Sequence, residues 1–106
     1  MRFLRFSMFD VAKAGDVSEA SDKVWKSPPP GVKMLARHIC LGIPFPGFPL
    51  NTMLSVDLIE AESTEALLAV TYPQALAGAS VWYVPVIELP MAEVGKLEWE
   101  QRGRTR

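Results

Sequence analysis

Apolar residues recur along the chain at two spacings, and these spacings predict four strands and two helices. Runs rich in phenylalanine, valine, isoleucine and leucine, whose neighbouring side chains point to opposite faces, are typical of strands. Such runs occupy residues 2–9, 33–42, 52–61 and 81–89. Apolar residues three and four positions apart predict a helix in two of the segments between them.

The first helix is predicted between Asp16 and Ser27. Aspartate is a favoured N-cap residue, and Glu19 follows Asp16 three residues later, as in a capping box. The helix would carry one apolar stripe, made of Val17, Ala20, Val24 and Trp25. Three consecutive prolines follow at residues 28–30, and the helix must therefore end by Ser27.

The second helix is predicted to begin after Ser63, which caps it. Glu65 in its first turn suits the positive end of the helix dipole. Pro73 should break or kink this helix, because proline lacks the backbone donor that a helix interior needs. Gly78 marks the end of the helix or the turn that follows it.

The predicted order is strand, helix, strand, strand, helix, strand. This order defines an α+β protein with the ferredoxin-like βαββαβ plan, in which two helices cover one face of a four-stranded antiparallel sheet. Pro85 lies inside the last strand, and proline is found in strands mainly at sheet edges. The fourth strand of this plan is an edge strand, so Pro85 supports it. We predict one domain over residues 1–90.

Both faces of the predicted sheet are apolar, which predicts a homodimer. In the last strand Trp82, Val84 and Val86 point one way, while Val81, Tyr83, Ile87 and Leu89 point the other. Two helices cover only one face, and the other would expose more apolar surface than soluble monomers usually do. Stacking two sheets as a symmetric pair would bury that face.

Residues 91–106 form a C-terminal tail with two readings. Leu97 and Trp99 alternate with charged residues, which fits a short strand laid on a partner subunit. The alternative is a charged, disordered end, since chain termini often lack structure.

Composition narrows the partners and the setting. The chain has 106 residues, a formal net charge of −1 and a pI of about 5.8, so a nucleic-acid partner is not expected. Its apolar runs are too short to span a bilayer, and residues 1–10 fit a first strand better than a signal peptide. The single cysteine, Cys40, cannot form an internal disulfide, and we expect a cytoplasmic protein.

Several short motifs resemble a known group of proteins. They are Pro28-Pro29-Pro30-Gly31-Val32-Lys33 followed by Leu35 and Arg37, a strand ending at Asp57 to Ala61, a helix start at Ser63 to Leu67, and Val84-Pro85-Val86. Together with the order of elements, they resemble the dimeric α+β barrel superfamily, and within it a family of small bacterial domains of unknown function. That family has a histidine two residues after the arginine, whereas here Ile39 holds that position and His38 comes one residue earlier.

The resemblance implies the fold and a dimer rather than one chemistry. Members of the superfamily include monooxygenases, isomerases and haem-degrading enzymes, and a shared fold does not fix a shared function.

Pairing the second and third strands near the middle of their connection predicts where a site would lie. Met34, Ala36, His38 and Cys40 would then share the partner-facing side of the sheet with Met53, Ser55, Asp57 and Ile59. His38 would act as acid or base, oriented by Asp57 or Ser55. The predicted ligand contacts are Arg5, Ser7, Cys40, Ser55 and Tyr83. Alternatively, these polar groups only satisfy one another at the subunit interface.

No motif for a metal or a cofactor is present, and none is predicted. His38 and Cys40 are two residues apart on a strand, about 6.6 Å between Cα atoms, which is too far for an easy dyad. A stable zinc site also needs three or four ligands.

Three functions follow from these observations. The first is a homodimer that holds a small, mostly apolar molecule between its sheets. The second is a cofactor-independent enzyme resembling monooxygenases or isomerases. The third is a dimer with no small-molecule site.

Overall fold

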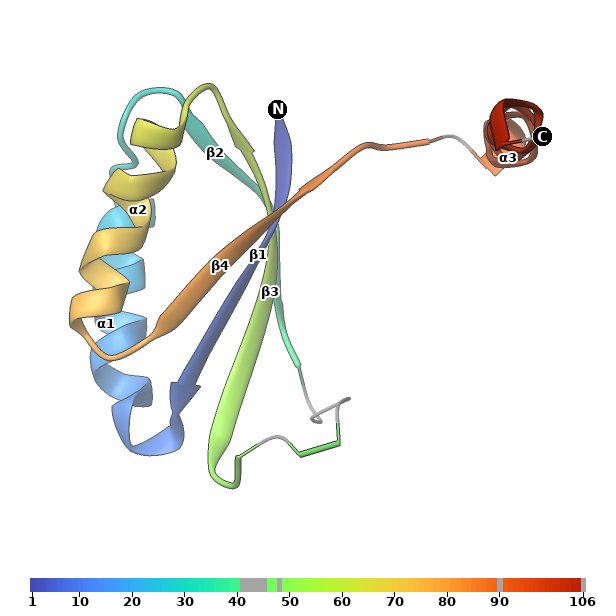
Figure 1. Cartoon of the computed structure of the whole chain (residues 1–106). Coiled ribbons are helices and arrows are strands. Elements are labelled where there is room, and N and C mark those ends of the chain that lie inside the picture. Colours follow the sequence, from blue (N-terminus) through green and yellow to red (C-terminus); the bar gives the residue numbers. More distant parts are fainter. Residues whose placement is uncertain (41–45, 48, 90, 106) are drawn as a thin grey trace.

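The computed structural model describes residues 1–40, 46–47, 49–89 and 91–105, with the side chains of 91–94 and 104–105 left aside. Four strands and two helices form the body of the molecule (Figure 1). In chain order the elements are β1 (Arg2–Asp10), a short 3-10 turn (Val11–Lys13), α1 (Ala14–Lys26), β2 (Val32–Ile39), β3 (Thr52–Ala61), α2 (Thr64–Leu76), β4 (Ser80–Val86) and α3 (Met91–Thr105). The strand predicted to reach Gly42 ends at Ile39, and residues 41 and 42 lie outside the described part.

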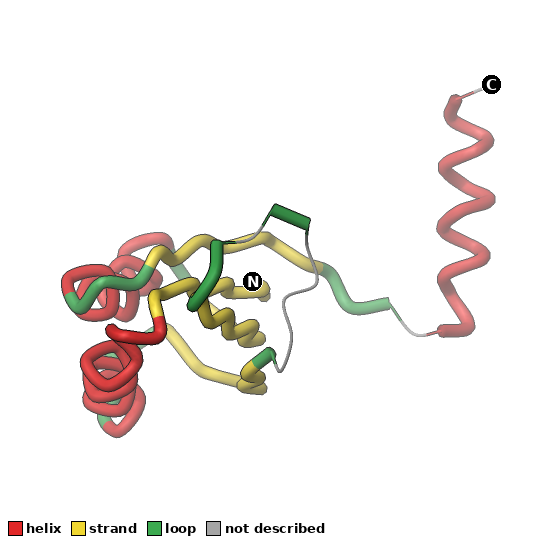
Figure 2. The backbone as a smooth tube through the Cα atoms, turned by 90° about the horizontal axis from the view of Figure 1, so that it is seen from below, coloured by secondary structure: helices red, strands yellow, loops and turns green. Residues whose placement is uncertain are grey.

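The four strands form one antiparallel sheet in the order β2-β3-β1-β4. Helices α1 and α2 cover one face of it, and the other face has no helix of the body over it (Figure 2). This is the ferredoxin-like α+β fold, and the prediction from the order of elements is confirmed. Pro85 lies on β4, which is an edge strand as predicted.

The helix starts follow local capping chemistry, with one correction. Ser63 caps α2 as predicted, because its Oγ accepts a hydrogen bond from the backbone N–H of Ala66 at 3.1 Å. The prediction of Asp16 as the cap of α1 is wrong. Asp10 instead accepts from the backbone N–H of Ala12 at 2.7 Å and starts the 3-10 turn that leads into α1. Asp16 lies in the first turn of α1, where its charge suits the helix dipole.

The C-terminal ends of α1 and α2 differ in how well the sequence predicted them. Helix α1 ends at Lys26 before the prolines, and Gly31 makes the next turn with φ +82°. Helix α2 continues through Pro73 to Leu76, so the predicted break does not occur. Pro73 removes one helix hydrogen bond, the one that an N–H at this position would donate to the carbonyl of Ala69, and its own carbonyl still accepts from the N–H of Ala77. Gly78 follows with φ +112° and ends the helix, as predicted.

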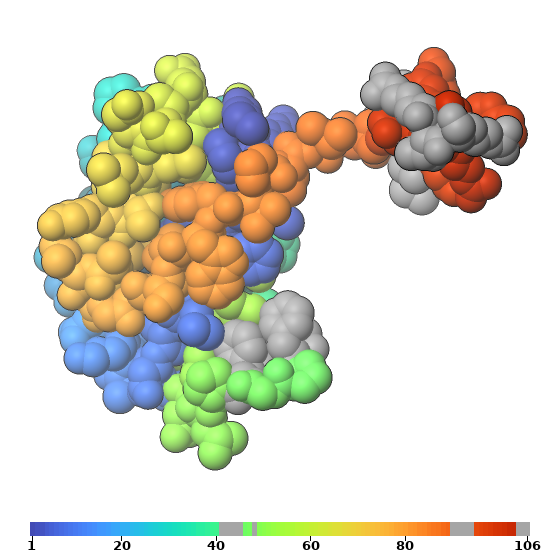
Figure 3. All heavy atoms as spheres, in the orientation of Figure 1, coloured from blue at the N-terminus to red at the C-terminus, as the bar shows by residue number. Residues whose placement is uncertain are grey.

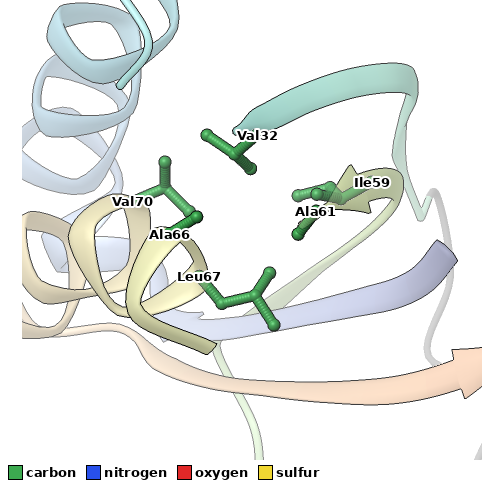
Figure 4. Close-up of a cluster of buried hydrophobic side chains, with 6 residues drawn as sticks. All are labelled: Val32, Ile59, Ala61, Ala66, Leu67 and Val70. Carbon is green, nitrogen blue, oxygen red and sulfur yellow. The ribbon is translucent and has the colours of Figure 1, made fainter. Parts of the chain in front are cut away.

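Two clusters of buried apolar side chains hold the helices on the sheet. The larger cluster joins the start of β2 and the end of β3 to helix α2 (Figure 4). It consists of Val32, Ile59, Ala61, Ala66, Leu67 and Val70. The smaller cluster lies at the opposite end of β1, where Phe9 packs against Val17 of α1 and Ala79. Between the two clusters the interior is polar.

The face away from α1 and α2, here called the open face, is mostly apolar. The strand registers place on it Leu4, Phe6, Met8, Ala36, His38, Leu54, Val56, Leu58, Trp82 and Val84. Phe6 and Trp82 stack with ring centroids 5.5 Å apart. Trp82 and Val84 each keep 42% of their surface exposed.

Residues 91–105 form a helix, so neither the predicted strand conformation nor the predicted disorder is found there. Helix α3 stands apart from the body, joined by a narrow extended segment (Figure 3). Figures 1 and 2 both place it on the side of the sheet that faces away from α1 and α2. Leucine, glutamate, lysine, glutamine and arginine, all good helix formers, outweigh the short alternation around Trp99. None of the described helices is long and apolar enough to cross a membrane.

Candidate functional site

A β-bulge divides the predicted site between the two faces of the sheet. The register of β2 against β3 shifts between Met34 and Ala36. Beyond the bulge, Arg37 lies opposite Asp57 and His38 lies opposite Val56. The extra residue exchanges the faces of all later β2 residues. His38 therefore points to the open face, while Asp57 points to the helices.

The polar residues of β1 and β3 do not face a partner as predicted, because they lie beside Ser21 of α1 and Gln74 of α2. Arg5 lies opposite Asp57, and Ser7 lies opposite Ser55, so the four form one group as predicted. All four are buried, with between 1% and 6% of their surface exposed. They face α1 and α2 within one protomer rather than the open face.

The centre of this group is an ion pair between β1 and β3. Arg5 Nη1 donates to Asp57 Oδ2 at 2.9 Å, and each side chain is only 1% exposed. The other carboxylate oxygen, Oδ1, accepts from the backbone N–H of His38 at 3.3 Å. Asp57 thus joins three neighbouring strands, and its charge compensates a guanidinium that would be strongly unfavourable in the interior on its own.

A small cavity lies beside the ion pair, between the sheet and the helices. Its volume is about 30 Å³. Arg5, Ser7 and Ser55 line it from the sheet, Ser21 from α1 and Gln74 from α2. At its edge Arg37 Nη2 donates to Ser21 Oγ at 2.7 Å, while Arg37 Nη1 lies 3.9 Å from Asp22. Phe9, Val17 and Ile39 also line the cavity, so its walls are part polar and part apolar, and they come from five different elements.

Two groups of this cavity have buried atoms without a hydrogen-bond partner among the described residues. They are Nε and Nη2 of Arg5 and Oε1 of Gln74. Such atoms are uncommon in protein interiors, because an unpaired buried polar group is unfavourable by about 1–3 kcal/mol. Arg5 therefore uses Nη1 for Asp57 and leaves two nitrogens, Nε and Nη2, without a partner among the described residues.

The remaining predicted site residues lie apart from this cavity. His38 is exposed on the open face, and its Nδ1 lies 3.1 Å from the carbonyl oxygen of Val56. No hydrogen bond joins the His38 ring to the Asp57 carboxylate, so the predicted acid–base pair does not form in the described structure. The backbone N–H of Cys40 donates to Leu54, which continues the β2–β3 pairing.

Tyr83 faces the helices and makes a structural contact. Its hydroxyl lies 2.6 Å from Thr71 Oγ1 on α2, and its ring meets Phe3 edge to face. The first contact joins β4 to α2, and the second joins β4 to its neighbour β1. Three or more histidine, cysteine, aspartate or glutamate side chains do not gather at any point of the described chain in a way that could hold a metal ion.

The sequence predicted part of the cavity and missed the part that the helices supply. Ser21 and Gln74 from the helices belong to it, as does Arg37 from β2, which stands out as a charge among the aliphatic residues of its strand. Ser21 lies four residues after Val17, which is on the buried side of α1. That helical spacing was the available signal for Ser21.

An open groove of about 580 Å³ lies elsewhere, between α1 and α2. Its lining includes Asp16, Glu19, Lys23 and Leu76, and none of the predicted site residues. It is therefore separate from the Arg5 cavity.

Comparison with known proteins gives a likeness in structure only. No family model matches the chain, and no curated protein matches its sequence. Among solved structures, the chain is similar to a protein from Caulobacter crescentus CB15 that is provisionally described as an antibiotic biosynthesis monooxygenase. The two share 12% sequence identity, with a TM-score of 0.44, over 82% of this chain and 91% of the other. A likeness at this level carries no argument about activity. The class is therefore that of small ferredoxin-like α+β proteins, as the strand order defines it.

Proposed function

We propose that this chain works as a homodimer in which the open faces of two sheets stack and enclose a small, mostly apolar molecule. The observation that carries the proposal is the open face itself. It consists mostly of aliphatic and aromatic side chains, among them Phe6 on the inner strand β1 and Trp82 and Val84 on the edge strand β4. Water contact with such a patch is unfavourable, and burying it gains about 25 cal/mol per Å².

The border of the open face supports the same proposal. Arg2 lies at one end of β1, 3.8 Å from Glu60 and in an ion pair with Glu88. His38 lies at the β2 side. Protein interfaces commonly have an apolar centre with such a polar rim.

Helix α3 is proposed to contact the partner subunit. It extends on the side of the sheet where a stacked second copy would lie (Figure 1). A single helix of 15 residues is marginal in water without packing. Trp99 is 68% exposed in one protomer, and a second copy would provide a surface for it.

The molecule proposed between the sheets is mostly apolar because the open faces that would enclose it are mostly apolar. The alternative of an enzyme has less support, since the predicted partner of His38, Asp57, is directed to the other side of the sheet. The remaining alternative is a dimer whose stacked open faces fill the space between them and hold no ligand.

Sedimentation equilibrium of the full chain tests the dimer. We expect a species of about twice the 11.7 kDa chain mass at micromolar concentration. Val84→Lys should produce monomers, because a symmetric interface would bury two unpaired lysines. Leu68→Lys is the matched control, since Leu68 lies on α2 with 62% of its surface exposed, on the far side of the sheet from the open face. A wild-type monomer, or a Val84→Lys dimer of unchanged affinity, would contradict the proposal.

The ligand is tested separately with a fluorescent apolar probe, N-phenyl-1-naphthylamine. The proposal expects saturable binding to the wild-type dimer and loss of binding by monomeric Val84→Lys. A dimer that shows no saturable binding would leave the interface in place and exclude the apolar ligand site.

A further inference from the structure

The free donors of Arg5 lie on one edge of its guanidinium. A guanidinium has two edges on which a pair of N–H groups points in parallel, one formed by Nη1 and Nη2 and the other by Nε and Nη2. Asp57 occupies Nη1 alone. The two nitrogens without a partner among the described residues, Nε and Nη2, are the pair that forms the side edge. The parallel N–H groups of such an edge match the two oxygens of a carboxylate.

The surroundings of this edge are enclosed and rich in hydrogen-bonding groups. Arg5 is 1% exposed, Ser7 and Ser21 are each 2% exposed, and all three line the cavity of about 30 Å³. A volume of about 10–15 Å³ already holds a water molecule, whereas pockets for whole organic ligands measure about 300–1,000 Å³. The cavity thus has room for one small group of a few atoms.

The balance of charge favours an anionic group. Inside the cavity wall, Asp57 compensates the charge of Arg5. Arg37 adds a second positive charge at the edge, and its nearest carboxylate, Asp22, is 3.9 Å away with a side chain 77% exposed to water. Gln74 has a fully buried acceptor without a partner among the described residues, and a 180° rotation of its amide would present N–H donors instead.

We propose that Arg5 binds a carboxylate group through Nε and Nη2 in this cavity. The carboxylate belongs either to a small free acid, such as formate or acetate, or to the end of a larger organic acid whose remainder leaves the cavity past Arg37. Ser7, Ser21 and Ser55 supply hydroxyl donors around the same group. The Arg5–Asp57 ion pair remains intact, because the anion uses the other edge of the guanidinium.

The site lies within one protomer, between the sheet and the helices. It does not depend on the stacking of open faces or on a ligand between them. Carboxylate binding that persists in monomeric Val84→Lys would support this site even if the proposed function failed.

Thermal unfolding of the full chain with sodium formate or acetate, against sodium chloride at equal ionic strength, tests the site. A ligand that binds only the folded state raises the melting temperature in a saturable way. We expect this rise with the carboxylates and none with chloride. Benzoate and hexanoate distinguish the sources, because a rise with these acids indicates the end group of a larger acid. A rise restricted to formate and acetate indicates a small free acid.

Two variants locate the effect. Arg5→Lys keeps the charge but removes the paired donors, and the carboxylate effect should disappear. Arg2→Lys is its matched control on the same strand, at a side chain 39% exposed, and should keep the effect. If Arg5→Lys does not fold, Ser7→Val provides the test, because it fills the cavity without changing the ion pair.

A crystal structure from saturating formate gives the direct answer. The proposal expects both formate oxygens within hydrogen-bond distance of Arg5 Nε and Nη2. Ordered water alone at that edge, or equal melting temperatures in formate and chloride, would overturn it. An effect of formate that survives Ser7→Val and Arg5→Lys unchanged would also overturn it.

Discussion

At the scale of single residues, the interior depends on how Asp57 compensates the buried charge of Arg5. Removing one partner of a buried ion pair typically lowers stability by about 3–5 kcal/mol, since the remaining charge stays buried. Asp57→Asn keeps the shape of the side chain and removes its charge. We expect it to lower the free energy of unfolding by about that amount, measured by urea denaturation.

Two further variants separate the charge from the packing. Replacing both partners with apolar residues, as Arg5→Met with Asp57→Leu, should recover most of the loss, because no charge is then left unpaired. Glu19→Gln breaks an exposed pair with Lys23 on α1 and should change stability by less than about 1 kcal/mol. A loss below about 1 kcal/mol in Asp57→Asn would show that Arg5 finds other compensation.

The sequence predicted which polar residues meet, but not what they face. Strand alternation places Arg5 and Ser7 on one side of β1, and Ser55 and Asp57 on one side of β3, and the structure brings the four together. Which side the helices cover depends on packing over the whole sheet, and both sides are apolar enough to permit either choice. Gln74 was missed because its place in the cavity depends on how α2 rotates against the sheet.

At the scale of elements, helix α2 begins with a cap whose contribution can be measured. Ser63 Oγ accepts from the backbone N–H of Ala66, a group that has no partner within the helix. Ser63→Ala should lower the free energy of unfolding by about 1 kcal/mol in urea denaturation. Ser63→Asp keeps an acceptor at this position and should keep the stability. Equal losses in both variants would mean that the hydroxyl contributes through packing instead.

Strands β3 and β2 differ in how much of their structure the sequence could predict. Residues 52–61 are rich in aliphatic side chains and lie between clear turn signals, and β3 has the predicted bounds. The β2 strand carries a bulge between Met34 and Ala36, and one extra residue leaves no mark in a pattern of period two. Uninterrupted alternation from Met34 therefore assigned His38 to the same face as Asp57. The bulge moves His38 to the opposite face, beside Val56.

At the scale of the whole molecule, the sheet alone is small for a stable interface. Four strands of 7 to 10 residues span roughly 19 by 28 Å, a face of roughly 500 Å². Standard protein interfaces bury about 800 Å² on each partner. Helix α3, with 15 residues, is about 22 Å long and about 10 Å wide. If each protomer packs its own α3 on the partner and also contacts the partner's α3, the buried area on each partner rises to roughly 900 Å². The proposed dimer therefore needs α3 as well as the sheet.

This requirement predicts that Trp99 on α3 contributes to dimer affinity although it lies far from the open face. Buried interface tryptophans commonly contribute more than about 1.4 kcal/mol, which corresponds to a tenfold change in affinity. Trp99→Ser should therefore raise the dimer dissociation constant at least about tenfold in sedimentation equilibrium. Tyr72→Ser is the matched control, because Tyr72 is 60% exposed on α2, away from the proposed interface, and should leave the constant unchanged. If both variants dimerise like the wild type, α3 does not pack on the partner, and the inference that the dimer needs α3 is wrong.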